Sequence, residues 1–268
     1  MNRIKKVQIE TIRDCNGKCR ICNYRDERHK PFYMTDQIFN KIVQQVSELP
    51  NLETVCPYNH GEPFLDPNLF GRIRYIKAHL PDVSIEVSTN GLLLHERNID
   101  AFCSLVDDRW ISFHGVNPFT YEYTMGLLWS NAEKLRRFIK DRPETKFVIS
   151  IGLTSKYTIE QVQDFWVCYD NVKLMTFVPR SRAGNIKSDE VESFYNPSNE
   201  DFDCWRFNLF LVYNTRGDLV PCSNDIRNEH VYANYKMPMK DIMRERERFR
   251  EQNREGKRTI CWKCENAN

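Results

Sequence analysis

Three cysteines near the N-terminus have the types and spacing that could do chemistry. Cys15, Cys19 and Cys22 lie within "RDCNGKCRIC" (13–22), with three and then two residues between them. Thiolates bind zinc or iron–sulfur clusters, and structural zinc sites usually close with four protein ligands. Three thiolates on a short loop can instead hold a cubane cluster by three of its irons. The fourth iron then stays open, so that a small molecule can bind and be activated there.

A second group of four cysteines follows residue 200: Cys204, Cys222, Cys261 and Cys264. The first of them precedes a predicted hairpin over 207–222 with its turn around 215–218, which places the second cysteine at the end of the hairpin. A helix of alternating charge is predicted over 239–252, and "CWKC" then supplies the last pair. The sequence therefore predicts two separate metal sites, one near each end of the chain.

The composition favours a soluble protein in a reducing compartment. Of 268 residues, 39 are basic and 37 acidic, so no strong net field favours nucleic acid or membrane as a partner. There is no apolar run of about 18 residues, and the N-terminus is charged too early for a secretion signal. Clustered cysteines in a reducing cytosol favour metal binding or catalysis over disulfides. We therefore expect a cytoplasmic location.

The scaffold is predicted from alternating strand-like and helical segments. Strands are predicted at 6–12, 52–57, 83–89, 109–115, 146–154 and 172–179. Helices are predicted at 35–49, 130–141 and 158–169. This alternation indicates an α/β fold with a parallel sheet, and no Gly-x-Gly-x-x-Gly follows a strand. We therefore expect a partial (βα)6 TIM-like barrel over 1–185, followed by a small cluster-binding domain of β-hairpin and helix over 186–268.

Short motifs follow the second, third and fourth predicted strands, where such barrels gather their chemistry. They are "HGEPFLDP" (60–67), "STNG" (88–91) and "ISFHG" (111–115). The residues of interest in them are Gly61, Glu62, Pro63, Thr89, Asn90 and Ser112. Each motif alone is an ordinary turn. Together with Cys-x3-Cys-x2-Cys after the first strand, they resemble the radical S-adenosylmethionine family over about residues 5–185.

The resemblance implies that the three N-terminal cysteines hold a [4Fe–4S] cluster whose open iron binds the methionine end of S-adenosylmethionine. It also implies that the motif residues contact this cofactor and that Gly61, Glu62 and Pro63 hold its amino group. Two positions depart from the family pattern. His60 replaces the usual first glycine, and Ile21 stands where an aromatic residue usually precedes the third cysteine. We expect Tyr24 to supply that aromatic surface.

The C-terminal cysteines resemble the shortened auxiliary-cluster domain called twitch, which is related to the longer SPASM domain. The longer domain has further cysteines after the final pair, whereas this sequence ends four residues after Cys264. One auxiliary [4Fe–4S] cluster with four protein ligands is therefore expected. Zinc remains an alternative at both ends: a knuckle completed by His29, or unrelated thiols, at the first site, and a four-cysteine ribbon at the second.

The implied activity is a radical S-adenosylmethionine oxidoreductase. A single auxiliary cluster favours net oxidation, and the pattern most resembles the butirosin-pathway type of alcohol dehydrogenase, which oxidises a secondary alcohol of an aminocyclitol to a ketone. Arg182, in "PRSRAGN", matches the position of a substrate-contacting arginine in that type. His114 and Tyr58 are candidates for proton handling because of their predicted place at strand ends.

Other activities stay open for the same pair of domains. A radical epimerase of a carbohydrate or peptide would return a hydrogen atom from a thiol, for which Cys56 is the candidate. A peptide-modifying maturase of the RiPP type is another alternative, although the first strand begins within seven residues and leaves no room for a leader-binding domain. A small-molecule or peptide substrate and a flavodoxin- or ferredoxin-type electron donor are the expected partners.

Overall fold

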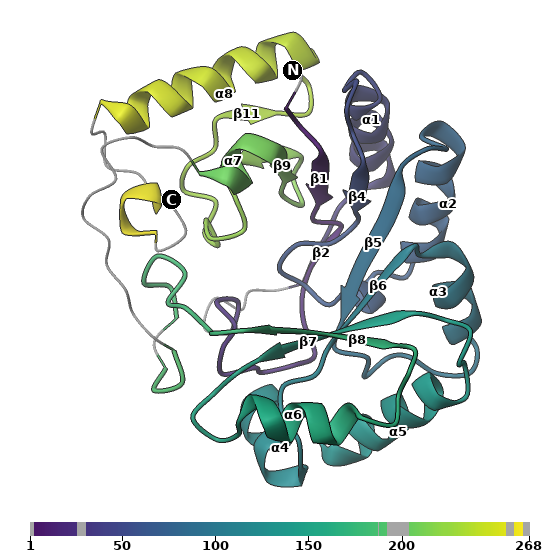
Figure 1. Cartoon of the computed structure of the whole chain (residues 1–268). Helices are drawn as coiled ribbons and strands as arrows, with labels where there is room; N and C mark the ends of the chain where they lie inside the picture. The colour runs from purple at the N-terminus through teal and green to yellow at the C-terminus, as the bar shows by residue number, and fades with distance from the viewer. Residues whose placement is uncertain (1–2, 26–30, 187, 192–203, 256–259, 265–268) are drawn as a thin grey trace.

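A nine-stranded sheet runs through the molecule (Figure 1). The computed structural model describes residues 3–25, 31–186, 188–191, 204–255 and 260–264. Along the sheet the strand order is β11-β10-β9-β1-β4-β5-β6-β7-β8. The strands are β1 (Lys6–Ile9), β4 (Thr54–Cys56), β5 (Ser84–Thr89), β6 (Asp108–Ser112), β7 (Phe147–Gly152), β8 (Val172–Phe177), β9 (Phe210–Tyr213), β10 (Asp218–Val220) and β11 (Ala233–Asn234).

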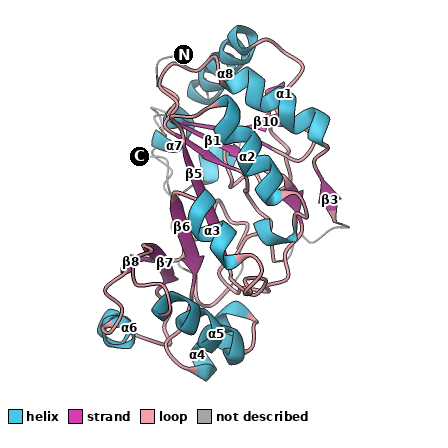
Figure 2. Cartoon of the chain, turned by 90° about the vertical axis from the view of Figure 1, so that its right-hand side faces the viewer, coloured by secondary structure: helices cyan, strands magenta, loops and turns pink. Residues whose placement is uncertain are grey.

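The six strands β1 and β4 to β8 are parallel to one another, which confirms the predicted α/β fold and partial barrel. Figure 2 shows helices on the outer side of the curved sheet. The helices are α1 (Asp36–Val46), α2 (Leu69–His79), α3 (Ile99–Leu105), α4 (Pro118–Met125), α5 (Trp129–Lys140), α6 (Ile159–Trp166), α7 (Trp205–Leu209) and α8 (Met239–Arg254). Two 3-10 turns are η1 (Pro63–Leu65) and η2 (Ile260–Lys263).

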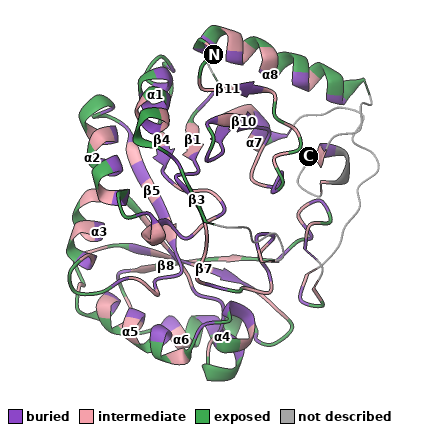
Figure 3. Ribbon diagram, turned by 180° about the vertical axis from the view of Figure 1, so that it is seen from behind, coloured by how far each residue is buried: buried purple, intermediate pink, exposed green. Residues whose placement is uncertain are grey.

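The core lies between the sheet and its outer helices. Alternate strand residues, such as Val7, Val55 and Ile85, are fully buried there. The residues between them face the barrel interior, because successive strand side chains point to opposite faces. In Figure 3 helices α1 to α3 are exposed on their outward side and buried toward the sheet. Lys6 and Glu86 are two polar residues at these inward positions.

Helix boundaries follow local capping chemistry. Thr35 accepts a hydrogen bond from the Ile38 N–H and begins α1, as its sequence predicts. Thr158 and Gln161 form a reciprocal capping box that begins α6. The predicted helix 158–169 is too long, since α6 ends at Trp166 and leaves Cys168 exposed beyond it.

The predicted hairpin is present as β9 and β10, joined by a turn with Gly217 at φ +79°. Strand β9 also pairs in parallel with β1, so the hairpin extends the barrel sheet. The boundary near residue 185 between two domains stays a prediction. None of the described helices is long and apolar enough to cross a membrane.

The first predicted strand, 6–12, is divided in the structure. β1 ends at Ile9, and the chain then forms β2 (Ile12–Arg13), which pairs with β3 (Phe32–Tyr33). Between the two strands Glu10 is fully buried, and its N–H donates to the Tyr213 carbonyl. The first cysteine loop therefore follows β2.

Candidate active site

The first cysteine loop, residues 14–22, lies against the C-terminal end of α4. The N–H groups of Lys18 and Arg20 donate to the carbonyls of Met125 and Thr124, at 3.1 and 2.8 Å. These carbonyls belong to the last turn of the helix and have no partner within it. The Cys19 Sγ lies 3.6 Å from the Met125 carbonyl oxygen. The helix end therefore fixes where the central cysteine lies.

The three thiols of this loop lie near one another. Burial raises the pKa of Cys19 well above its usual value, and the neighbouring Cys22 and Cys15 raise it further. A Cβ added to Gly17 would lie 3.7 Å from the Sγ atoms of both Cys15 and Cys19, so these two sulfurs lie on the same side of Gly17. This thiol-only donor set fits an iron–sulfur cluster.

A single-ion site is not preformed in the described part of the chain. No three His, Cys, Asp or Glu side chains there are arranged to hold one metal ion. A cubane cluster is larger than one ion and spreads its ligands more widely. His29, the possible fourth ligand of a zinc knuckle, lies outside the described residues.

Glu62 joins the ends of two barrel strands beside this loop. Its carboxylate accepts hydrogen bonds from the Thr89 hydroxyl at 2.6 Å, the Asn90 N–H at 2.8 Å and the Phe64 N–H at 3.2 Å. It also caps η1, which begins at Pro63. Glu62, Thr89 and Asn90, predicted from separate motifs, thus form one connected group.

Asn90 connects this group with the cysteine loop. Its Nδ2 donates to Asn16 Oδ1 at 2.7 Å and lies 4.0 Å from Cys15 Sγ.

Ser112 lies on the inner face of β6, in register with Ser150. Tyr24 is buried, and its hydroxyl donates to the Arg13 carbonyl at 3.1 Å. Burial raises the pKa of the Tyr24 phenol to about 12.

Gly61 allows the motif segment and the cysteine loop to approach each other. The Glu62 N–H donates to the Asp14 carbonyl at 2.8 Å. A Cβ at Gly61 would lie 2.6 Å from the Ile12 carbonyl oxygen and 2.7 Å from that of Asp14. Both are backbone atoms, so a side chain here forces the two segments apart.

We expect Gly61→Ala to lower the free energy of unfolding by about 1–3 kcal/mol, as overpacked cores do. Chemical denaturation of the metal-free protein measures it. Gly71→Ala in α2 is the matched control, because its new Cβ meets only the side chain of Asn68, which can rotate away. Equal destabilisation by the two substitutions would contradict the proposed close approach at Gly61.

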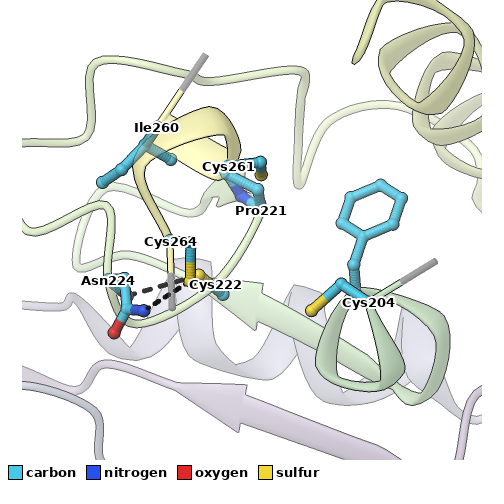
Figure 4. A pocket seen from close by; sticks show the side chains of 8 residues that line it. Cys204, Pro221, Cys222, Asn224, Ile260, Cys261 and Cys264 are labelled. Atoms are coloured by element: carbon cyan, nitrogen blue, oxygen red, sulfur yellow. Dashed lines mark hydrogen bonds between the residues drawn. The ribbon is translucent and has the colours of Figure 1, made fainter. Parts of the chain in front are cut away.

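The four C-terminal cysteines line one pocket, as Figure 4 shows. Cys204 precedes α7, Cys222 follows β10, and the last two belong to η2 or follow it. Cys222 and Cys264 point toward Asn224, and Cys204 lies on the opposite side of the pocket (Figure 4). Residues from three separated segments therefore converge where the sequence predicts a second metal site.

Asn224 supplies hydrogen bonds to two sulfur atoms of this pocket. Its main-chain N–H lies 3.3 Å from Cys222 Sγ, and its Nδ2 lies 3.4 Å from Cys264 Sγ. Such outer donors orient metal-bound thiolates. Burial raises the pKa of Cys222 to about 12, and the nearby Cys264 and Cys204 thiols add to the shift. Four cysteines that line one pocket, two of them buried, fit a metal cluster together with these amide donors.

Inside the barrel, Glu86 on β5 is the centre of a polar group. Its Oε1 accepts from the Tyr58 hydroxyl at 2.9 Å and from the Cys56 thiol at 3.4 Å. Its Oε2 accepts from Lys6 Nζ at 2.6 Å. Burial, with Glu86 nearby, raises the pKa of Cys56 well above its usual value. Burial, with Cys56 and Glu86 nearby, does the same for Tyr58. Cys56 and Tyr58 therefore stay protonated donors.

His114 is a neutral hydrogen-bond donor in this structure. Its Nδ1 accepts from the Gly152 N–H at 3.0 Å, so the ring hydrogen is on Nε2. Burial lowers its pKa to about 4, and the positive charge of Arg182 lowers it further. With one nitrogen accepting and the other protonated, His114 is unsuited to act as a base.

Arg182 lies within electrostatic range of both cysteine groups. Burial lowers its pKa, whereas Cys22, Cys222 and Cys264 raise it. The guanidinium stays charged, since arginine is not deprotonated in proteins. Residues 182–184 all have positive φ, between 49° and 79°, which turns the chain sharply after β8.

Sequence reasoning did not identify Glu86, Lys6 or Glu10 as site residues. The signal for Glu86 was its charge within the predicted strand "VSIEVST", at a position alternating with buried Ile85 and Val87. Lys6 is likewise a charged residue on the inner face of a strand. No local pattern shows that Glu10 is buried, because its partners come from residues 60 and 215.

Comparison with known proteins supports the family resemblance. A model of the Radical SAM superfamily matches residues 9–165, more than half of the chain. The chain is 26% identical over 144 residues to the tungsten-containing aldehyde ferredoxin oxidoreductase cofactor-modifying protein of Pyrococcus furiosus. It is 30% identical over 200 residues to the GTP 3′,8-cyclase of Picosynechococcus sp.. These matches cover 53% and 70% of this chain, but only 40% and 59% of the two relatives.

Solved structures share the fold over nearly the whole chain. BtrN in complex with AdoMet and 2-DOIA has a TM-score of 0.70 at 18% identity, covering 98% of this chain and 93% of BtrN. SuiB of Streptococcus suis, bound to precursor peptide SuiA, has a TM-score of 0.75 at 14% identity, covering 98% and 70%. The protein anSMEcpe with bound AdoMet has a TM-score of 0.69 at 16% identity, covering 98% and 86%. At these identities the similarity concerns the fold alone.

Proposed function

This chain belongs to the Radical SAM superfamily, and we propose that it oxidises a secondary alcohol of a sugar or aminocyclitol to a ketone. Cys15, Cys19 and Cys22 hold the [4Fe–4S] cluster that binds S-adenosylmethionine. When bound, this cluster and cofactor supply a 5′-deoxyadenosyl radical that removes one hydrogen atom from the substrate. The remaining tasks belong to the protein: it binds the substrate, accepts the hydroxyl proton and provides an acceptor for the remaining electron.

The segment around Glu62 is proposed to receive the amino group of the cofactor. Glu62 is buried and joins Thr89 and Asn90 beside the cysteine loop, so its negative charge faces the region next to the first cluster. Ser112, on the inner face of β6, is a further proposed cofactor contact. Tyr24 is a further proposed contact, and its hydroxyl donates to the Arg13 carbonyl. The buried Ile21 packs at Gly152, at the end of β7.

We expect binding of S-adenosylmethionine to weaken as the pH falls through about 7. Burial raises the pKa of Glu62 to about 7, although hydrogen bonds from Thr89, Asn90 and Phe64 oppose the shift. Protonation removes the charge that attracts the cofactor amino group, so affinity falls up to about tenfold per pH unit below the pKa. Calorimetric titration from pH 6 to pH 8 measures this dependence.

The raised pKa of Glu62 has the opposite effect on the stability of the protein without cofactor. Because the folded-state pKa lies above the usual 4.5, the folded protein gains stability as the pH falls from about 7 toward 4.5. Glu62→Gln is the control, since it removes the titrating group and should flatten both dependences. A pH dependence of binding that persists in Glu62→Gln would contradict the role given to this carboxylate.

The observation that carries oxidation as the reaction is the convergence of four cysteines on one pocket. A cluster with four protein ligands has no open iron, so it suits electron transfer better than substrate binding. We propose that Cys204, Cys222, Cys261 and Cys264 hold such an auxiliary [4Fe–4S] cluster. It would supply the acceptor for the electron that remains on the substrate when both a hydrogen atom and a proton have left.

The proton of the substrate hydroxyl is proposed to leave through Tyr58 and Glu86. The Tyr58 oxygen accepts this proton while its own passes to Glu86 Oε1, which lies 2.9 Å away. Lys6 Nζ, at 2.6 Å from Oε2, stabilises the negative charge that Glu86 needs to attract the proton. His114 and Arg182 then serve as donors that orient the substrate hydroxyls, since neither has a free basic nitrogen.

The experiment is a substrate screen with anaerobically reconstituted protein, S-adenosylmethionine and a chemical reductant. Polyols and aminocyclitols are tested as substrates, and we expect one molecule of ketone for each molecule of 5′-deoxyadenosine formed. Deuterium at the oxidised carbon should appear in 5′-deoxyadenosine. A product at the same oxidation state as the substrate would show that the enzyme is not a dehydrogenase. A flavodoxin- or ferredoxin-type protein is the proposed natural electron donor.

A radical epimerase is the second candidate, because the structure keeps Cys56 as a buried, protonated thiol beside Glu86. Such a thiol could return a hydrogen atom to the opposite face of the substrate radical. Incorporation of one solvent deuterium into an unoxidised product, lost in Cys56→Ala, would favour this activity. A peptide maturase is a further alternative, given the fold shared with peptide-bound SuiB.

A further inference from the structure

The segment after Cys222, residues 223–226, is held to the barrel through its carbonyl groups. We call it the Cys222 loop. The Ser223 carbonyl accepts from His60 Nε2 at 2.6 Å and from Asn23 Nδ2 at 3.2 Å. The Asn224 carbonyl accepts from Asn185 Nδ2 at 2.8 Å, and the Ile226 carbonyl from Arg13. Arg13 and Asn23, which flank the first cysteine group, therefore bind the loop that follows Cys222 of the second group.

His60 is a buried titratable residue in this set of contacts. It is 8% exposed and forms a pair with Glu10, whose carboxylate is fully buried. The distance from His60 Nδ1 to Glu10 Oε1 is 2.9 Å. The other carboxylate oxygen accepts from the Thr215 N–H at 3.3 Å, in the turn of the β9–β10 hairpin. The pair thus touches the barrel, the hairpin turn and the Cys222 loop.

Both ring nitrogens of His60 face hydrogen-bond acceptors. Nε2 faces the Ser223 carbonyl, and Nδ1 faces the Glu10 carboxylate. Asn59 Nδ2 also lies 3.1 Å from Nδ1, and the buried Oδ1 of the same amide has no hydrogen-bond partner among the described residues. A half-turn of this amide puts its oxygen toward Nδ1 and satisfies that atom. The Glu10 carboxylate and the Ser223 carbonyl both accept from the ring only when each ring nitrogen carries a hydrogen.

We propose that His60 is a positioning residue: as an imidazolium paired with Glu10, it fixes the Cys222 loop against the segment that begins at Gly61. The cluster-positioning part of this proposal rests on the proposed auxiliary site. His60 directly precedes Gly61 and Glu62, and Ser223 directly follows Cys222, so one side chain joins the two proposed cofactor regions.

The protonation of both ring nitrogens of His60 is tested first, in the metal-free wild-type protein. Nitrogen-15 NMR of histidine-labelled protein distinguishes a doubly protonated ring from either neutral tautomer. We expect His60, assigned by its loss in His60→Gln, to carry hydrogen on both nitrogens. His114 in the same spectrum should be neutral with hydrogen on Nε2 only. A His60 ring without hydrogen on Nδ1 would place the proton on Glu10 and overturn the proposal.

The positioning role is tested at the second metal site with reconstituted variants. We expect His60→Gln to lower metal retention by that site about tenfold under chelator challenge, as losses of outer-shell contacts do. His60→Gln should also shift the redox potential and EPR spectrum of the second cluster. His79→Gln is the matched control, because His79 is exposed and its Nδ1 lies 2.9 Å from the Tyr75 carbonyl within α2. Unchanged retention, potential and spectrum in a folded His60→Gln protein would refute the role.

These measurements separate the positioning role from the proposed reaction. If the second site holds zinc, the redox and EPR measurements cannot be made, and the proposed dehydrogenase has no electron acceptor. The NMR result and the effect of His60→Gln on metal retention would still decide the role of His60. Glu10→Gln should give the same loss of retention, because it leaves His60 without its counter-charge.

Discussion

Cys19→Ala yields a protein that forms no 5′-deoxyadenosine above the uncatalysed background. Cys19 is the central one of the three N-terminal thiols, and α4 fixes it through the Lys18 and Met125 contacts. A cluster held by only three protein ligands loses a third of its anchors with this sulfur. The remaining two thiols cannot keep the fourth iron in place for the cofactor.

The measurement is chromatographic quantitation of 5′-deoxyadenosine after anaerobic reconstitution and reduction. Cys103→Ala is the matched control, since Cys103 lies in α3 on the outer side of the sheet and should leave cleavage unchanged. Reductive cleavage by Cys19→Ala at a rate near that of the wild type would show that this loop does not hold the radical-generating cluster.

Cys222→Ala separates cofactor cleavage from completed turnover. Cys222 lies in the pocket with the three other C-terminal cysteines, away from the first loop in sequence, and its thiol interacts with Cys264 and Cys204. Its removal opens the coordination of the second cluster. We expect 5′-deoxyadenosine formation to stay within several-fold of the wild type, while oxidised product falls about a hundredfold, as for losses at metal sites.

Both products are measured in the same reaction, so the ratio of 5′-deoxyadenosine to ketone reports the uncoupling. Cys168→Ala is the control, because that cysteine is exposed beyond α6. Equal loss of both products in Cys222→Ala would show that the second site chiefly supports the fold. Unchanged formation of 5′-deoxyadenosine and ketone in Cys222→Ala would show that the auxiliary site takes no part in the reaction.

The barrel could be predicted from sequence because its signals are local. Each strand carries its own β-branched run, and Thr35 and Thr158 are capping residues within a few positions of the helices they begin. The cysteine spacing and the segments after β4, β5 and β6 are also local patterns. Their convergence follows from the parallel sheet, whose strand ends share one edge.

The remaining features depend on contacts between distant residues. The division of the first strand follows from Glu10, which pairs with residues 60 and 215. The neutral state of His114 depends on the Gly152 N–H, 38 residues away. The continuous sheet arises because β9 pairs with β1, across about 200 residues of chain. No local pattern encodes such partners, so the sequence identified His114 as a candidate for proton handling but not the hydrogen bond from the Gly152 N–H that leaves its ring as a donor.

The most direct test of the central claim is iron and sulfide content after anaerobic reconstitution. It compares the wild type with a variant in which Cys15, Cys19 and Cys22 are all alanine. Two cubane clusters predict about eight irons and eight sulfides per wild-type chain and about four of each in the variant. About four irons in the wild type, with zinc present and unchanged in the variant, would contradict the auxiliary cluster. No loss of iron in the variant would contradict the radical site itself.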